Sequence, residues 1–404
     1  MINILYLHAG AEMYGADKVL LELVKGLDKA EFTPIVVLPC NGLLVEALKK
    51  EGIETEIIPY PILRRKYYNL KGILQYIVQY IGFSKKVCEF AQQKNIQLLH
   101  INTTAVLEGI YLKKKLKIPL IWHIHEIIIK PKIVFKVLSS IVGKYADKIV
   151  VVSNAVGQHW IGSKRMESSK IKTIYNGVNN AVFNPNNNAD YLRTELHIPP
   201  HAQVVGMIGR VNACKGQLDF LKAIEPLLAK YMNMFAVMVG GVFQGEEWRL
   251  IELEKIVSSS PYKDRIFILN FREDTANLHA LFDVFVLPST SPDSLPTVVL
   301  EAMATGKPIV GYRHGGLCEM LIDGEVGLLA NVCCPTDLSR KINLIIHDKE
   351  LCSAMGMNAI KRQRECFSMQ SFLENFSDLY KVLNLAKVEG FYNASNRKIV
   401  KPNI

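Results

Sequence analysis

The chain has 404 residues, 49% of them hydrophobic, which is enough for two domains, and its net charge of +10 lies within residues 1–200, where 26 basic side chains face 16 acidic ones. Eight cysteines form no C-x-x-C pair and no metal-ligand spacing, which argues against a disulfide framework and a cysteine-bound metal and favours a reduced, cytoplasmic chain. Because polar residues break the longest apolar runs and the N-terminus is typical of a strand, we expect neither a transmembrane helix nor a signal peptide.

The chain opens with a strand, a glycine-bearing loop and a helix, the start of a βαβ unit. Ile2–Leu7 is strand-like, the loop spans His8–Asp17, and Lys18–Asp28 has one apolar face. The G-x-G-x-x-G dinucleotide fingerprint is missing, which argues against a dehydrogenase. Gly15 is either a turn residue or the point at which this loop approaches a ligand.

Two segments of the first half, residues 63–80 and 127–145, interleave basic with aromatic and aliphatic residues. No nucleic-acid motif accompanies them, so we expect no nucleic-acid partner. The mixture fits helices that lie at an anionic membrane surface, although amphipathic core helices with a solvated basic face would show the same pattern. We therefore predict a peripheral protein on the inner face of the plasma membrane.

Further strand-like runs, at 34–38, 97–101, 120–124 and 148–152, alternate with helical patterns and predict a doubly wound parallel sheet. His123 and His125 lie at a strand end and point to the same side, because strand side chains alternate. We expect one to be functional and the other to be structural. Polar stretches near 184–188 and 197–200 mark a linker between a first domain, residues 1–190, and a second, residues 200–370.

The second domain opens with a strand at 204–208 and the loop GRVNACKGQ before a helix. Such a loop can direct Arg210, Lys215 and several backbone N–H groups at a diphosphate. The alternative is a pair of solvated basic residues.

A strand at Val284–Leu287 is followed by a polar loop and a second helix. We expect Ser294 to cap this helix and Pro296 to lie in its first turn. The loop carries Asp293, and the helix carries Glu301 eight residues later. Taken alone, these are either a functional carboxylate pair or an ordinary loop acid and a helical glutamate.

The run from Pro288 to Val310 resembles the signature of retaining glycosyltransferases of the GT-B fold, family 4, also called glycosyl transferases group 1. The matching residues are Pro288, Ser289, Glu301, Ala302, Met303, Ala304, Gly306, Pro308 and Val310. Further matches to the family are Gly15 in the first loop, Gly209, Arg210, Lys215 and Gly216 in a G-R-x-x-x-x-K-G pattern, and Phe271 and Arg272 in a G-F/Y-R loop. Asp293 replaces the usual glutamate, and Pro296 replaces a glycine whose N–H would face the donor.

The resemblance implies two Rossmann-like doubly wound domains facing a cleft, with a helix at about 371–390 packing back on the first. It implies that the first domain binds the acceptor and the second binds a nucleoside-diphosphate sugar. The catalytic candidates are Asp293 near the sugar, Glu301 on the ribose, Arg210 and Lys215 on the diphosphate, and His125 or His123 across the cleft. The donor-binding candidates are Gly15, Gly209, Arg210, Lys215, Phe271, Arg272, Ser294, Leu295, Thr297 and Glu301.

The resulting hypothesis is a retaining glycosyltransferase that needs neither metal nor cofactor. The basic, aromatic first domain suggests a saccharide acceptor that is lipid-linked, as in surface or capsular polysaccharide synthesis. Two alternatives stay open, a sugar-nucleotide epimerase of the same fold and a non-catalytic nucleotide-sugar-binding protein.

Overall fold

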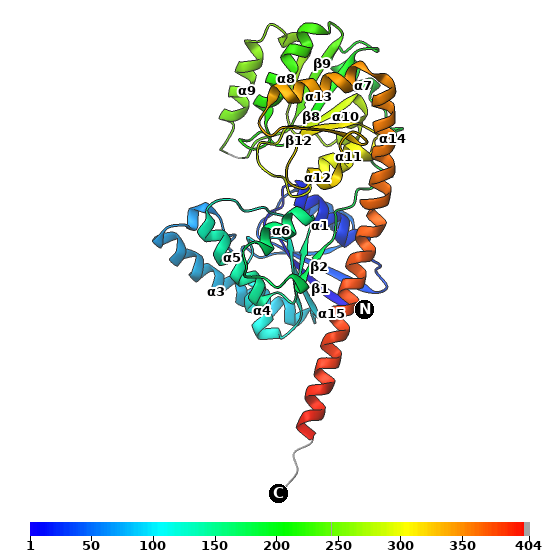
Figure 1. Ribbon diagram of the computed structural model, residues 1–404. Coiled ribbons are helices and arrows are strands. Elements are labelled where there is room, and N and C mark those ends of the chain that lie inside the picture. The colour runs from blue at the N-terminus through cyan, green and yellow to red at the C-terminus, as the bar shows by residue number, and fades with distance from the viewer. Residues whose placement is uncertain (244, 400–404) are drawn as a thin grey trace. The chain divides into compact units, whose positions relative to one another are not determined.

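The computed structural model describes residues 1–243 and 245–399, with residues 386–399 described by their backbone alone. The chain divides into two compact units, coloured by residue number in Figure 1. Unit 1 comprises Met1–Tyr175 and the C-terminal segment from Gln370, and unit 2 comprises Asn176–Met369. Each unit is described separately below.

Unit 1 is built on a seven-stranded sheet with helices on both faces (Figure 1). Its strands are β1 (Ile2–Leu7), β2 (Phe32–Leu38), β3 (Glu54–Ile57), β4 (Leu98–Ile101), β5 (Leu120–Ile124), β6 (Lys148–Val151) and β7 (Ile171–Thr173). Its helices are α1 (Gly15–Gly26), α2 (Leu43–Lys50), α3 (Leu70–Gln93), α4 (Glu108–Leu116), α5 (Lys132–Tyr145), α6 (Asn154–Ile161) and α15 (Met369–Ile399), with 3₁₀ turns η1 (Arg65–Tyr67) and η2 (Ser168–Lys170). All neighbouring strands pair in parallel, in the order β3-β2-β1-β4-β5-β6-β7.

Unit 2 repeats this plan with six parallel strands in the order β10-β9-β8-β11-β12-β13. These strands are β8 (Gln203–Ile208), β9 (Met234–Val239), β10 (Ile266–Leu269), β11 (Val284–Leu287), β12 (Ile309–Tyr312) and β13 (Gly327–Ala330). The helices are α7 (Asp190–Glu195), α8 (Gln217–Lys230), α9 (Trp248–Ser258), α10 (Thr275–Leu281), α11 (Thr297–Ala304), α12 (Leu317–Met320), α13 (Pro335–His347) and α14 (Lys349–Cys366), with the 3₁₀ turn η3 (Lys263–Arg265). The doubly wound architecture expected for both domains is confirmed.

The sequence of the strands explains this layering. Central strands such as β9 (MFAVMV) and β11 (VFVL) are apolar throughout and buried along their whole length, as parallel strands covered by helices on both faces must be. The edge strand β3 (ETEI) instead exposes its two glutamates, which discourages pairing with another chain.

The strand order reverses once in each sheet, and this reversal positions the candidate site. In unit 1 the reversal lies between β1 and β4, and in unit 2 it lies between β8 and β11. At such a switch point the two connections leave on opposite faces, so the loops at the carboxyl ends of the strands diverge and leave a crevice that binds ligands. The loops after β1, β4, β8 and β11 are therefore where substrate-binding side chains are expected.

The C-terminal helix α15 completes the core of unit 1. Phe376 and Tyr380 are fully buried against the sheet. The Tyr380 hydroxyl accepts a hydrogen bond from the Tyr6 hydroxyl at 3.1 Å and lies 2.8 Å from His100 Nδ1. Residues from the first and last quarters of the sequence thus share one core.

Two boundaries differ from the sequence-based expectation. Unit 1 ends at Tyr175 rather than near residue 190, because the following residues are bound to unit 2, where Asn180 hydrogen-bonds Gln363 at 2.8 Å and Val178 bridges to Ser368. Helix α1 begins at Gly15 rather than Lys18, because Asp17 accepts the Tyr14 N–H at 2.8 Å and closes the first turn.

Candidate active site

The loop between β8 and α8 carries the two cations singled out in the sequence. The Asn212 side-chain oxygen accepts the Lys215 N–H at 3.1 Å, and the Gln217 side-chain amide donates to the Arg210 carbonyl at 3.1 Å. The Arg210 guanidinium stacks on Phe243, with Cζ 3.5 Å from the ring centroid. These contacts hold both cations on a compact loop at the switch point of unit 2.

The loop between β11 and α11 lies beside the first and places Asp293 against Lys215. The Thr290 N–H donates to a carbonyl of the β8–α8 loop at 2.8 Å. The Gly316 N–H donates to the Asp293 carbonyl at 2.8 Å, and a Cβ on Gly315 would lie only 2.3 Å from that carbonyl oxygen. As a result, Lys215 Nζ lies 2.6 Å from Asp293 Oδ1, and both side chains are about one-quarter exposed.

Glu301 lies on α11, where it is only 3% exposed. Its Oε2 is 3.3 Å from Nε2 of His279, a fully buried residue of α10. The carboxylate is therefore already oriented within unit 2. A ribose that hydrogen-bonds Glu301 would have to approach a carboxylate that is buried beside His279.

The prediction that Ser294 caps this helix is wrong. Helix α11 begins at Thr297 with Pro296 in the cap position, and no side chain caps it. The backbone before the helix is held instead by a distant segment, since a Cβ on Gly316 would lie 2.0 Å from the Ser294 carbonyl oxygen. Leu295 is buried, so only its backbone is placed to meet a ligand, while Ser294 and Thr297 are partly exposed.

Three further donor-binding candidates lie at the carboxyl edge of the same sheet. Gly209 follows β8 directly, and Phe271 is 42% exposed beyond the end of β10. The neighbouring Arg272 binds two carboxylates, Glu195 at 2.5 Å and Asp274 at 2.7 Å. Its hydrogen bonds lower the pKa of Asp274 to about 2. A donor phosphate would have to compete with these carboxylates for Arg272.

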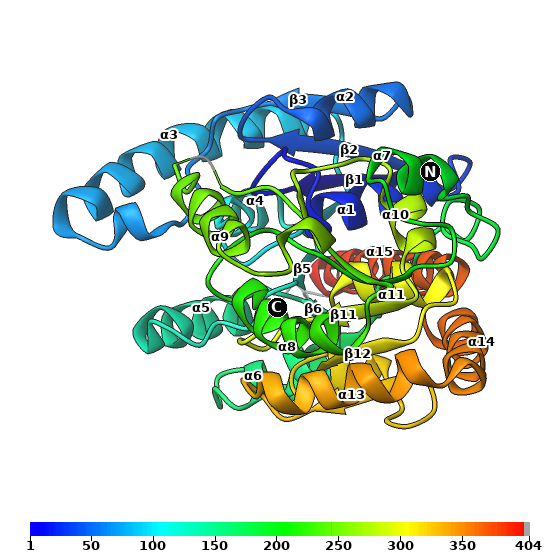
Figure 2. The same cartoon turned by 90° about the horizontal axis from the view of Figure 1, so that it is seen from above.

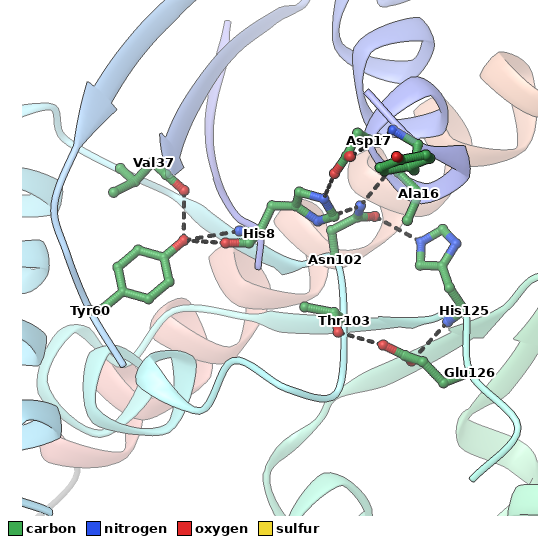
Figure 3. Close-up of polar contacts among 10 residues, drawn as sticks. His8, Ala16, Asp17, Val37, Tyr60, Asn102, Thr103, His125 and Glu126 are labelled. Carbon is green, nitrogen blue, oxygen red and sulfur yellow. Dashed lines mark hydrogen bonds and ion pairs between the residues drawn. The ribbon is translucent and has the colours of Figure 1, made fainter. Parts of the chain in front are cut away.

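A second polar cluster lies at the switch point of unit 1 (Figure 3). His8 follows β1, Asn102 follows β4, and His125 follows β5. His8 Nε2 lies 2.5 Å from Asp17 Oδ1, and Asn102 bridges His8 Nδ1 at 3.1 Å and His125 Nε2 at 3.0 Å. Gly15 begins α1 just ahead of Asp17.

The two candidate histidines differ in exposure. His123 is fully buried, 3.3 Å from His100, whereas His125 is partly exposed. Burial lowers the pKa of His125 to about 3 and that of His100 to about 3, and it also lowers the pKa of His123. All three rings are therefore neutral near pH 7. Of the pair, His125 is the one that a ligand can reach.

Sequence reasoning missed His8, Asn102 and His279. His8 and Asn102 carried a usable signal, because each directly follows a buried strand that flanks a switch point. His279 carried none, because it lies within an ordinary apolar helical segment. Among residues 1–243 and 245–385, whose side chains the structure describes, no group of three or more His, Cys, Asp or Glu residues could hold a metal ion.

Two doubly wound parallel-sheet units with polar loops at both switch points define a protein of the GT-B fold. Residues 13–182 match the family model described as Glycosyltransferase Family 4, and residues 188–362 match the model described as Glycosyl transferases group 1. Together the two models cover most of the sequence. The chain belongs to the GT-B glycosyltransferases.

Curated relatives and solved structures agree with this assignment. The D-inositol 3-phosphate glycosyltransferase of Corynebacterium kroppenstedtii is 28% identical over 241 residues, 58% of this chain and 53% of the relative, so the chain spans about half the length of that protein. The N-acetyl-alpha-D-glucosaminyl L-malate synthase of Bacillus anthracis is 25% identical over 77% of this chain and 81% of its own. Anabaena HepE, solved with UDP and glucose, superposes with a TM-score of 0.82 at 23% identity over 94% of this chain and 100% of its own.

Proposed function

We propose that the protein transfers a sugar from a nucleoside-diphosphate sugar to a saccharide acceptor with retention of anomeric configuration. The observation that carries the proposal is a loop at the switch point of unit 2 that holds two cations, Arg210 and Lys215, with Lys215 paired to the carboxylate of Asp293. A diphosphate is the ligand that such a loop suits, and a sugar attached to it would lie near a carboxylate.

Each side chain then has a physical role. Arg210 and Lys215 bind the diphosphate and stabilise the negative charge that grows on it as the sugar departs, a role that needs no metal ion. Asp293 faces the sugar, where a carboxylate stabilises developing oxocarbenium charge. Glu301 binds the ribose, and His125 orients the sugar. With the acceptor attacking from the leaving-group face, orientation and charge stabilisation supply most of the rate.

Calorimetric titration with UDP, GDP, ADP and NAD tests the donor site. We expect one diphosphate to bind and its affinity to fall at least about 100-fold in an Arg210→Ala/Lys215→Ala variant, because two charge-assisted contacts are lost. UDP is the first ligand to try, since Anabaena HepE was solved with UDP. A Lys222→Ala/Lys255→Ala variant removes the same charge from exposed positions on α8 and α9 and should bind normally. Failure of all four ligands to bind would contradict the proposal.

The acceptor side of the proposal is based on the surface of unit 1. Exposed apolar side chains follow one stripe along the first half of α3, at Leu70, Ile73, Leu74, Ile77, Val78 and Ile81. Ile133 and Val137 are exposed apolar residues of α5. This helix projects from the same side of unit 1 as α3 in both views (Figures 1 and 2). Within the described part of the chain, no helix is both long and apolar enough to cross a membrane.

Exposed basic residues lie close in sequence to these apolar side chains. Arg64, Arg65 and Lys66 lie just before α3, and Lys132 and Lys136 lie on α5. Apolar side chains that enter the interface and cations that bind anionic lipid headgroups together suit a peripheral membrane contact. We therefore propose a lipid-linked acceptor, used at the cytoplasmic face of the membrane in surface polysaccharide synthesis.

Replacing Arg64, Arg65 and Lys66 with serine should weaken cosedimentation with vesicles of anionic lipid about 10-fold or more, since each basic residue near such a surface contributes about 1 kcal/mol. The control replaces Lys29, Lys49 and Lys50 with serine, which removes the same charge from exposed positions outside α3, α5 and the turn before α3. Equal sedimentation of the two variants would show that Arg64, Arg65 and Lys66 do not form the membrane contact.

A further inference from the structure

A continuous chain of hydrogen bonds runs through the polar cluster of unit 1 and ends on His125. It passes from the Asp17 carboxylate to the ring of His8, then through the Asn102 side-chain amide to the His125 ring (Figure 3). His8 and Asp17 are 3% and 7% exposed, and Asn102 is fully buried, so little solvent reaches the groups that precede His125.

One backbone carbonyl group determines which ring nitrogen of His8 and which ring nitrogen of His125 carries a proton. The Ala16 carbonyl oxygen, which can only accept, lies 3.4 Å from one end of the Asn102 amide, so that end is the NH₂ group. The same NH₂ faces His8 Nδ1, which must accept, and His8 therefore carries its proton on Nε2, facing Asp17. The amide oxygen faces His125 Nε2, which must donate. In the opposite orientation of the amide, the Asn102 side-chain oxygen would face the Ala16 carbonyl oxygen, and neither oxygen could donate a hydrogen bond.

We propose that Asp17, His8 and Asn102 are positioning residues that hold neutral His125 in the tautomer protonated on Nε2, so that Nδ1 is its hydrogen-bond acceptor for a substrate hydroxyl. The identity of that substrate as a sugar rests on the proposed function, whereas the tautomer does not. Neutrality of the ring agrees with the effect of burial on the pKa of His125. A ring that offers a lone pair selects a hydroxyl donor and fixes its direction.

The Asp17→Asn variant tests whether the three residues act in series. Asp17 Oδ2 accepts the Tyr14 N–H at 2.8 Å, so an asparagine must keep its oxygen there and turn its NH₂ toward His8. His8 Nε2 must then accept, and its proton moves to Nδ1, against the Asn102 NH₂. We expect the Asn102 amide to rotate so that its oxygen accepts from His8, which turns its NH₂ toward His125 Nε2 and moves the His125 proton to Nδ1.

The measurement is ¹⁵N NMR of selectively labelled histidine in the ligand-free 404-residue chain, with a His125→Ala variant to assign the signals. We expect His125 protonated on Nε2 in the native protein and on Nδ1, or on both nitrogens in exchange, in Asp17→Asn. The kcat for sugar transfer should fall about 10- to 100-fold with little change in the KM for the donor, because a ring nitrogen that no longer accepts misplaces the sugar rather than the nucleotide.

Asp28→Asn is the matched control, because it removes one carboxylate charge from an exposed position near the end of α1. It should leave both the spectrum and kcat unchanged. A native His125 protonated on Nδ1, or an unchanged His125 tautomer in a folded Asp17→Asn variant, would overturn the relay. A shifted tautomer with unchanged kcat would overturn the substrate contact. Absence of any sugar transfer by the native protein would count against the proposed function alone, because the spectrum needs no substrate.

Discussion

Replacing Asp293 with asparagine is expected to lower kcat by about 10²- to 10³-fold while leaving diphosphate binding intact or tighter. The carboxylate lies beside the position proposed for the sugar, and asparagine keeps its shape while removing its charge. Loss of one preorganised charged group at a reacting centre costs an effect of this size. A general loss of folding would instead lower both activity and binding.

The expected gain in diphosphate affinity comes from Lys215. Its ammonium lies 2.6 Å from Asp293 in the ligand-free chain, and the diphosphate must compete with this carboxylate. A partly exposed ion pair contributes at most about 1 kcal/mol, so its removal should tighten binding by up to about fivefold.

Calorimetry with the diphosphate that binds the native protein and a transfer assay with its nucleotide sugar separate the two effects. Asp264→Asn, at an exposed position of η3, is the matched control and should behave as the native protein does. Native kcat in the Asp293→Asn variant would show that the role proposed for this carboxylate is wrong.

Replacing Gly216 with alanine should destabilise unit 2 and abolish diphosphate binding. Gly216 has a φ of +77°, and a Cβ there would lie 1.9 Å from the Pro288 carbonyl oxygen. The β8–α8 loop and the β11–α11 loop would have to separate, which would move Lys215 away from Asp293. We expect a loss of at least about 3 kcal/mol in unfolding free energy, from backbone strain and a clash that only a backbone shift relieves.

Gly324→Ala separates these two causes. Gly324 also has a positive φ, +89°, but no atom lies within 4 Å of the Cβ that would be added. It should therefore cost only the backbone strain of about 1–2 kcal/mol and leave diphosphate binding unchanged. Chemical denaturation and calorimetry on both variants measure the difference. Equal unfolding free energies and equal affinities would show that the close approach of the two loops is unimportant.

Short strands were predictable residue by residue. The runs predicted for β5 and β11 have the bounds that the structure shows. Each is a short apolar segment bounded by polar residues or proline, and in a parallel sheet covered on both faces burial along the whole strand requires that composition. The residues of the β8–α8 and β11–α11 loops were also identified in advance, because each loop directly follows such a strand.

Helix starts were predicted less well, since they depend on contacts that a local pattern does not contain. Ser294 has the chemistry of a capping residue, yet the backbone around it is held by Gly315 and Gly316, and α11 begins three residues later. The polar stretch at 184–188, predicted to mark a linker, belongs to unit 2, where the Asn188 carbonyl accepts a hydrogen bond from the Asn277 side chain at 2.6 Å.

The amino-acid sequence was therefore sufficient to predict the alternation of strands and helices and the two-domain plan, and to assign the charged side chains of the second domain to the loops and the helix that carry them, because each of these depends on neighbours along the chain. It was not sufficient for the partners of those groups. Asn102 meets His8 across 94 positions, and Lys215 meets Asp293 across 78. The spatial order of the strands in each sheet decides which loops meet. This order depends on packing among all the elements rather than on the residues of any one of them.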